Sequence, residues 1–254
     1  MSKAVLITGA GARVGQDLAR RLANDGWAVA IHYNRSKSGA LALAAEITKA
    51  GGTAATVQAN LCVPQELDSL VARAAQALGK PLTALINNAS TFSPDTAQNF
   101  TRASYEYHMD VNLRAPLHLT QQLAAQLPIT AEAKEGETGC VINMIDQRVL
   151  KPNPLFFSYS AAKAALYWAT KTQAQSYAPH LRINAIGPGP TLASIHQDQD
   201  EFEAEARATL LGTPSSLDAI YGGVSYLLGA VSVTGQMIAV DSGQHLTWQT
   251  ADLT

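Results

Sequence analysis

Residues 4–15 read AVLITGAGARVG, the pattern of a strand, a tight turn and the start of a helix. The apolar run Ala4–Thr8 leads into a glycine turn, and a helical pattern starts at Val14. Glycines allow a tight turn whose backbone approaches a phosphate, and the positive end of the next helix faces the anion. The pattern G-x-G-x-x-G is not met, because Val14 stands at the third glycine and Gly15 follows it. The position between strand and helix favours phosphate binding over a purely structural turn.

Outward from this stretch, short apolar runs alternate with longer helical stretches rich in Ala and Leu. We expect strands at Ala4–Thr8, Ala28–His32, Thr53–Gln58, Ala84–Ile86, Cys140–Asn143, Arg182–Ile186 and Gln236–Val240. We expect helices at about Val14–Asp25, Leu41–Ala50, Gln65–Leu78, Arg102–Gln126, Tyr159–Ser176 and Ser216–Leu228. The alternation predicts one doubly wound, Rossmann-type α/β domain over residues 1–254, with a seven-stranded, mainly parallel sheet and helices on both faces.

Two polar segments interrupt this alternation. Thr130–Thr138 is rich in charged residues, which is typical of a surface loop without a chemical role. Thr191–Gly212 is polar and then helical, late in the chain. Such sheets bind ligands beside the carboxyl ends of their strands, so we expect a substrate-loop insertion at about 191–212.

The composition narrows the class of function. Hydrophobic residues make up 47% and charged residues 15%, which predicts a large core and argues against disorder. A net charge of -2 argues against a nucleic-acid binder. Cys62 and Cys140 form no disulfide framework and no metal-ligand spacing, so no metal is expected. With neither a secretory leader nor an apolar run of membrane-spanning length, we expect a cytoplasmic protein.

The second predicted strand ends in HYNRS, residues 32–36, and carries no carboxylate. In NAD-binding domains an acidic residue here takes the ribose hydroxyls, whereas an arginine accommodates the 2′-phosphate of NADP. Arg35 can bind that phosphate and Ser36 can donate a hydrogen bond to it. The alternative is a solvated surface arginine. The segment favours NADP(H) over NAD(H).

Tyr159 and Lys163 stand four residues apart, so on a helix they share a face. A lysine ammonium near a phenol lowers the phenol's pKa, and the tyrosine can then transfer a proton near neutral pH. Such a pair is usually a surface accident when isolated. Here it begins the helix after the fifth strand, where the cleft of this fold is completed.

Five motifs, in order, resemble the short-chain dehydrogenase/reductase family over nearly the whole chain. They are Thr8-Gly9 through Gly15, Asn87-Asn88-Ala89, Asn112, Tyr159 with Lys163, and Gly187-Pro188-Gly189. The resemblance implies that Tyr159 is the proton donor and that Lys163 lowers its pKa and binds the nicotinamide ribose. It also implies that Asn112 supports a proton-relay water.

The same resemblance implies an NADP(H) site in the loops that follow the strands. Its residues are Gly9, Arg13, Val14, Tyr33, Asn34, Arg35, Ser36, Asn60, Leu61, Asn88, Ala89, Ser90, Lys163, Pro188, Gly189 and Thr191. Thr191 is the side-chain candidate for the nicotinamide carboxamide. Asn60 stands where the family usually has an aspartate for the adenine amino group, and its side-chain oxygen can still accept that bond.

Four departures from the family pattern resemble its pteridine reductase branch. Asp146 replaces the serine that usually lies 13 residues before the tyrosine, and Arg13 replaces a glycine of the phosphate loop. Ser90 replaces another glycine and is followed closely by Phe92. The HYNRS segment is the fourth departure. The resemblance therefore implies a pterin-like substrate and a homotetramer, with His245 and Trp248 in a C-terminal tail where the branch has an arginine.

The chemistry of a pterin agrees with this substrate class. Phe92 can stack on the flat ring, with the nicotinamide on its other face. Asp146 can accept hydrogen bonds from ring N–H groups or deliver a proton to a ring nitrogen, whereas an ionised carboxylate repels a developing oxyanion. Arg13, Ser90 and Tyr159 complete the expected substrate site. The alternatives are a helix or turn cap for Asp146, core packing for Phe92 and a solvent-facing Arg13.

Three functions are compatible with these residues. The leading hypothesis is an NADPH-dependent reductase of dihydrofolate, dihydrobiopterin or dihydromonapterin type. The second is a carbonyl or 3-oxoacyl reductase of the same family, against which Asp146 argues. The third is a non-catalytic NADP(H) sensor, against which the complete set of Tyr159, Lys163 and Asn112 argues.

Overall fold

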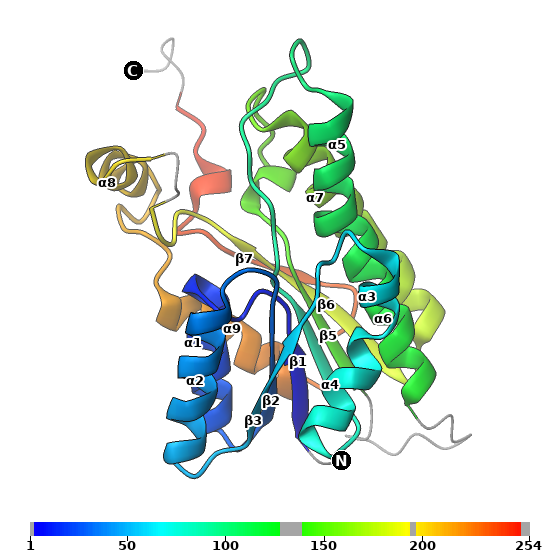
Figure 1. Cartoon of the computed structure of the whole chain (residues 1–254). Helices are drawn as coiled ribbons and strands as arrows, with labels where there is room; N and C mark the ends of the chain where they lie inside the picture. The colour runs from blue at the N-terminus through cyan, green and yellow to red at the C-terminus, as the bar shows by residue number, and fades with distance from the viewer. Residues whose placement is uncertain (1–2, 128–138, 194–196, 250–254) are drawn as a thin grey trace.

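The computed structural model describes residues 3–127, 139–193 and 197–249, and places one sheet between two layers of helices (Figure 1). The seven strands lie in the order β3-β2-β1-β4-β5-β6-β7, and every neighbouring pair is parallel. They are β1 (Ala4–Ile7), β2 (Ala28–Tyr33), β3 (Ala54–Gln58), β4 (Ala84–Asn87), β5 (Gly139–Met144), β6 (Leu181–Pro188) and β7 (Met237–Val240). The predicted doubly wound α/β fold is confirmed, with a sheet that is parallel throughout.

The helices cover both faces of the sheet. They are α1 (Arg13–Asn24), α2 (Lys37–Lys49), α3 (Pro64–Asp68), α4 (Leu70–Leu78), α5 (Arg102–Met109), α6 (Ala115–Gln126), α7 (Phe157–Tyr177), α8 (Gln199–Arg207) and α9 (Leu217–Gly229). Three short helices, η1 (Asp110–Arg114), η2 (Gln147–Val149) and η3 (Gln244–Leu246), connect or follow them. Gly26 has φ +82° just after α1, as expected of a residue that ends a helix.

Two apolar cores hold the layers together. On one face α1, α2 and α9 pack side chains such as Leu18, Leu43 and Val224 against the strands. On the other face α4 and α6 pack Leu70 and Leu119 in the same way. Because both faces are covered, the central strands are apolar at almost every position.

Two predicted helices differ in their interior. Residues 65–78 form two helices divided at Ser69, whose hydroxyl donates to the carbonyl oxygens of Gln65 and Glu66. Residues 102–126 form one continuous run whose middle, η1, is a π-helical turn. The predicted loop 130–138 lies outside the described residues. The insertion predicted at 191–212 contains α8, which stands apart from the sheet (Figure 1).

The carboxyl ends of the strands lie at the edge of the sheet where this fold binds ligands. The strand order reverses between β1 and β4, and in doubly wound sheets ligands bind in the crevice at that point. None of the described helices is long and apolar enough to cross a membrane. Among the described residues, no group of three or more His, Cys, Asp or Glu side chains could hold a metal ion.

Candidate active site

The glycine turn after β1 lies close against its neighbours. A Cβ at Gly15 would lie 2.5 Å from Nδ2 of Asn88, and one at Gly11 would lie 2.7 Å from the carbonyl oxygen of Ser36. Gly9 has φ +66° and Arg13 has φ +54°. Arg13 therefore keeps the left-handed backbone typical of glycine, at a position where the family has one.

Two polar side chains fix this turn. The side chain of Asn88 donates to the carbonyl oxygens of Thr8 and Gly9 at 2.9 and 3.4 Å, so it holds the turn rather than facing open solvent. Buried His32 accepts the backbone N–H of Gly9 at Nδ1, and its Nε2 lies 3.0 Å from the carbonyl oxygen of Ala59. Burial lowers the pKa of His32 to about 4, so the ring is neutral and can make both bonds.

A cavity of about 430 Å³ lies beside the turn, at the carboxyl ends of β2 and β3. Its walls include the predicted Gly9, Arg13, Val14, Tyr33, Asn34, Arg35, Ser36, Asn60, Leu61, Asn88, Ala89 and Ser90, together with Tyr107 and Val111, which sequence reasoning missed. No carboxylate is among the wall residues, and Arg35 is exposed. Oδ1 of Asn60 already accepts the backbone N–H of Cys62 at 3.1 Å, which leaves it one further lone pair.

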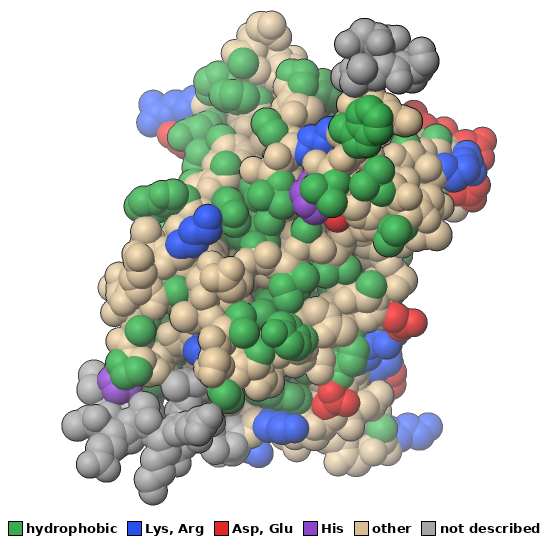
Figure 2. All heavy atoms as spheres, turned by 180° about the vertical axis from the view of Figure 1, so that it is seen from behind, with side chains coloured by type: hydrophobic (Ala, Val, Ile, Leu, Met, Phe, Trp, Pro, Cys, Tyr) green, Lys and Arg blue, Asp and Glu red, His purple; other side chains and the backbone are tan. Residues whose placement is uncertain are grey.

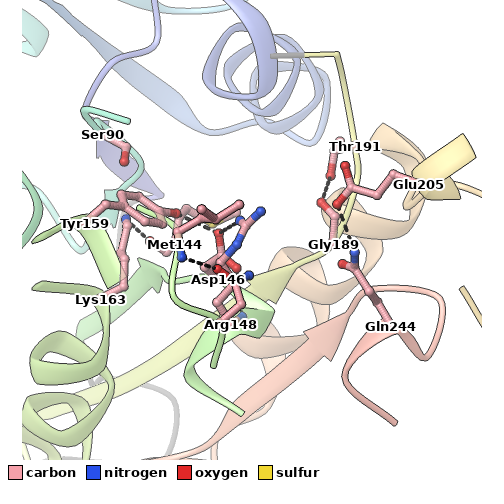
Figure 3. A network of polar contacts seen from close by, with 12 residues as sticks. Ser90, Met144, Asp146, Arg148, Tyr159, Lys163, Gly189, Thr191, Glu205 and Gln244 are labelled. Carbon is pink, nitrogen blue, oxygen red and sulfur yellow. Dashed lines mark hydrogen bonds and ion pairs between the residues drawn. The ribbon is translucent and has the colours of Figure 1, made fainter. Parts of the chain in front are cut away.

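A larger cavity of about 740 Å³ adjoins the first and is lined by three of the four predicted catalytic residues, Tyr159, Lys163 and Asp146, but not by Asn112 (Figure 3). Tyr159 from α7 donates its hydroxyl to Oδ2 of Asp146 at 2.8 Å. Lys163, one turn further along α7, donates to the carbonyl oxygen of Met144 at 2.7 Å. Its Nζ lies 5.7 Å from the centre of the Tyr159 ring. The structure thus brings Tyr159, Lys163 and Asp146 together in one buried group.

Burial and the Asp146 carboxylate govern the electrostatics of this group. Burial, followed by the charge of Asp146 and its hydrogen bond, raises the pKa of Tyr159 well above its usual value. In this arrangement the Asp146 carboxylate is the dominant neighbour of the phenol, and the lowering of this pKa by Lys163 stays a prediction. Burial lowers the pKa of Lys163 to about 8. Tyr159 holds its proton firmly, while Lys163 can release one near neutral pH.

Asp146 also caps the start of η2, which is the structural role that the sequence left open as an alternative to substrate binding. Its Oδ1 accepts the backbone N–H of Arg148 at 2.8 Å, at the start of η2. Its Oδ2 accepts the Arg148 guanidinium at 3.0 Å in addition to the Tyr159 hydroxyl. Capping therefore fixes the direction of the carboxylate toward Tyr159.

An aromatic wall closes one side of the larger cavity. Phe92 stacks on Phe156 with ring centres 4.0 Å apart, and its edge contacts Tyr159. The Arg148 guanidinium lies 5.5 Å from the centres of both phenylalanine rings. Phe92 thus packs against Phe156, in line with the packing role given above as the alternative, and it also lines the cavity.

Asn112 lies in the π-helical turn η1 and is fully buried. Its Oδ1 accepts the backbone N–H of Thr91 and the hydroxyl of Ser90, and its Nδ2 donates to the carbonyl oxygen of Thr91. The hydrogen bonds of the Asn112 side chain therefore all go to the loop after β4. Single π turns inside helices are frequent at functional sites.

The loop after β6 supplies the remaining predicted residues. Pro188, Gly189 and Thr191 line the larger cavity, and the Thr191 hydroxyl donates to the carbonyl oxygen of Gly189. The Arg13 guanidinium crosses from the phosphate turn and donates to the carbonyl oxygens of residues 192 and 193, so it is not simply solvent-facing. Sequence reasoning missed several lining residues: Arg148, Phe156, Gln197, Phe202, Glu205 and Gln244. Only Arg148 had a usable signal, since it lies two residues after Asp146.

Comparison with known proteins agrees with this geometry. The family model of short chain dehydrogenases matches residues 3–204, so the chain belongs to the short-chain dehydrogenase family. An uncharacterized oxidoreductase of Methylorubrum extorquens is 32% identical, over 95% of this chain and 97% of its own. A 3-oxoacyl-[acyl-carrier-protein] reductase of Staphylococcus epidermidis is 26% identical, over 97% and 100%. The crystal structure of FolM alternative dihydrofolate reductase 1 from Brucella suis, in complex with NADP, matches with a TM-score of 0.93 and 41% identity over 99% and 98% of the two chains.

The protein is thus a short-chain oxidoreductase, and its cofactor is NADP(H). The residues of the smaller cavity fit that cofactor. The glycine turn leaves no room for side chains where a pyrophosphate approaches, and an exposed arginine stands at the end of β2 in place of a carboxylate.

Proposed function

We propose that this protein is an NADPH-dependent reductase that transfers a hydride to a pterin-like substrate of the dihydrofolate, dihydrobiopterin or dihydromonapterin class. The observation that carries the proposal is the hydrogen bond between Tyr159 and Asp146 inside a cavity with an aromatic wall. The likeness to a protein described as an alternative dihydrofolate reductase, at 41% identity, supports it.

The bound cofactor supplies the hydride that reduces the C=N bond of the substrate. Tyr159 supplies the proton to the ring nitrogen, because its raised pKa keeps the phenol protonated until nitrogen becomes basic. Asp146 holds the phenol hydroxyl in place and accepts a hydrogen bond from a substrate N–H at the free lone pair of Oδ1. Ser90 and Arg13 border the same space, and Phe92 with Phe156 offers the apolar surface that a flat ring needs.

Proton return to Tyr159 passes through Lys163. Its lowered pKa of about 8 lets it give up a proton near neutral pH. We assign the relay role of Asn112 to its backbone in the π turn, since its side chain is bound to Ser90 and Thr91. The remaining cofactor contacts that the sequence predicts are part of the same proposal.

A second function has one observation in its favour. The relative from Staphylococcus epidermidis is a 3-oxoacyl-[acyl-carrier-protein] reductase, at 26% identity. A carbonyl reductase needs a donor facing the developing oxyanion, whereas Asp146 presents acceptor oxygens there. The charge at this position therefore favours the pterin.

A turnover assay with NADPH separates these functions and the sensor alternative. The substrates are a panel of dihydropterins, a reactive diketone and a short 3-oxoacyl thioester. The proposal expects turnover of at least one dihydropterin well above that of both carbonyl compounds. Rapid reduction of the carbonyl compounds alone supports the second function, and binding of NADPH without any turnover supports a sensor. The proposed cytoplasmic location and homotetramer are separate from this outcome.

A further inference from the structure

A carboxylate on α8 lies in the substrate cavity, away from the catalytic group. Glu205 lines the same cavity as Tyr159 and Asp146, and Figure 3 shows it with Gln244 on the far side from Tyr159. It is partly buried. The catalytic steps described above do not use it, so its position needs another explanation.

Two amides hold this carboxylate in one orientation. Nε2 of Gln197 donates to Oε2 of Glu205 at 2.9 Å, and Nε2 of Gln244 donates to Oε1 at 2.9 Å. The three residues come from the loop before α8, from α8 itself and from η3. A carboxylate offers about four acceptor positions, so each oxygen retains capacity for a further donor. All three side chains line the cavity, where a substrate can supply that donor.

The charges around the cavity are unevenly distributed. Arg148 is paired with Asp146 and Lys163 lies beside Tyr159, while the Arg13 guanidinium is bound to the carbonyl oxygens of residues 192 and 193. The wall formed by α8 instead contributes the carboxylates of Glu201 and Glu205. Acidic side chains gather on α8 and form the red cluster at the upper right of Figure 2. The wall formed by α8 is therefore negative, since the basic residue of that helix, Arg207, pairs with Glu203 and is not among the residues that line the cavity.

We propose that Glu205 selects among pterins according to the side chain that the pterin ring carries. It accepts hydrogen bonds from hydroxyl groups on a neutral hydroxyalkyl side chain, and it repels the carboxylates of a glutamate-bearing side chain. This inference rests on the proposed pterin reductase function and adds to it the identity of the selecting residue.

Glu205 also joins α8 to the C-terminal turn, and loss of that link alone would impair all substrates alike. A change in the ratio between two substrates separates selection from such a latch. Glu205→Gln removes the charge with little change in shape. Glu203→Gln is the matched control, because Glu203 lies on the same helix, is exposed, is not among the residues that line the cavity, and accepts hydrogen bonds from Gln199 and Arg207. Gln244→Ala loosens the link while the carboxylate stays.

The experiment measures kcat/KM with NADPH for a hydroxyalkyl dihydropterin and for dihydrofolate, in wild type and the three variants, at low and high salt. Hydrogen bonds to charged groups contribute about 1.5–3 kcal/mol, so Glu205→Gln should lower the hydroxyalkyl value roughly 10-fold. It should raise the dihydrofolate value, while Glu203→Gln changes neither. High salt should narrow the preference of every protein that keeps the Glu205 carboxylate, and it should have no such effect in Glu205→Gln, because screening weakens the repulsion.

Each other result has a definite meaning. Equal losses for both substrates in Glu205→Gln, matching those of Gln244→Ala, overturn selection and leave a latch. An unchanged ratio in Glu205→Gln overturns it as well. If the wild type reduces neither pterin while it reduces ketones, the proposed function itself fails. A wild type that reduces pterins with an unaltered ratio in the variant defeats only the inference about Glu205.

Discussion

The hydroxyl of Tyr159 donates a 2.8 Å hydrogen bond to Oδ2 of Asp146, and both side chains are buried. The two residues are 13 positions apart, and the carboxyl end of β5 and the start of α7 bring them together. A phenol has one proton to donate, so the hydroxyl must turn away from Oδ2 before it protonates any substrate atom, a ring nitrogen or a carbonyl oxygen alike. A substrate N–H group can replace the phenol as a donor to the carboxylate, whereas a simple ketone has no such donor.

Replacing Tyr159 by Phe should lower turnover by roughly 100-fold or more, because general acid catalysis contributes about that much. The ring and its packing against Phe92 remain, so NADPH affinity should stay near that of wild type. Steady-state kinetics and a fluorescence titration with NADPH measure the two quantities. Near-normal turnover would remove Tyr159 from the mechanism.

Replacing Arg35 by Ala should weaken NADPH and leave NADH nearly unchanged. A charge-assisted bond to a phosphate contributes about 1.5–3 kcal/mol, which corresponds to roughly 10- to 100-fold in affinity. Dissociation constants for both cofactors in wild type and variant check this prediction. A similar loss of affinity for NADH would mean that Arg35 does not bind the 2′-phosphate.

Acid should loosen the phosphate turn through His32. Its pKa is about 4 in the folded protein against an ordinary 6.5, so the unfolded chain binds the proton more readily. The stability that neutral His32 contributes is present above pH 6.5 and is lost as pH falls toward 4, by on the order of 3 kcal/mol. Denaturant unfolding of wild type and His32→Gln at pH 7.5 and 5 measures it. The variant should be less stable at pH 7.5 and lose less on acidification; parallel losses in both proteins would exclude this role.

The protein should be a homotetramer in solution, as the family resemblance implies. Closed symmetric assemblies of this kind are common among oligomeric proteins. Light scattering should give a mass near four times the 26.8 kDa of one chain. A fully active species with the mass of a single chain would contradict the prediction.

Much of the fold follows from residue patterns, because strands covered on both faces must be apolar and the glycine turn marks the first crossover. The π turn at η1 was not predictable, since Asp110–Arg114 carries no glycine or proline that would signal a departure from a regular helix. Tyr159 and Lys163 were predicted from their helical spacing, their place after the fifth strand and the family resemblance together. The place of Phe156 in the aromatic wall could not be predicted. Its backbone is left-handed, with φ +56°, and no neighbouring glycine in the sequence indicates such a conformation.

We infer that Asp146 adapts this site to a pterin, and the variant Asp146→Ser separates this role from that of a carbonyl reductase. Serine can donate to an oxyanion, whereas an ionised carboxylate only accepts, so the exchange should favour ketones over ring nitrogens. The measurement is the pair of kcat/KM values for a dihydropterin and a reactive diketone, in wild type and variant. We predict that the variant loses most of its dihydropterin reduction and that any activity toward the diketone rises. A wild type that reduces the diketone well and no dihydropterin at all would contradict the account.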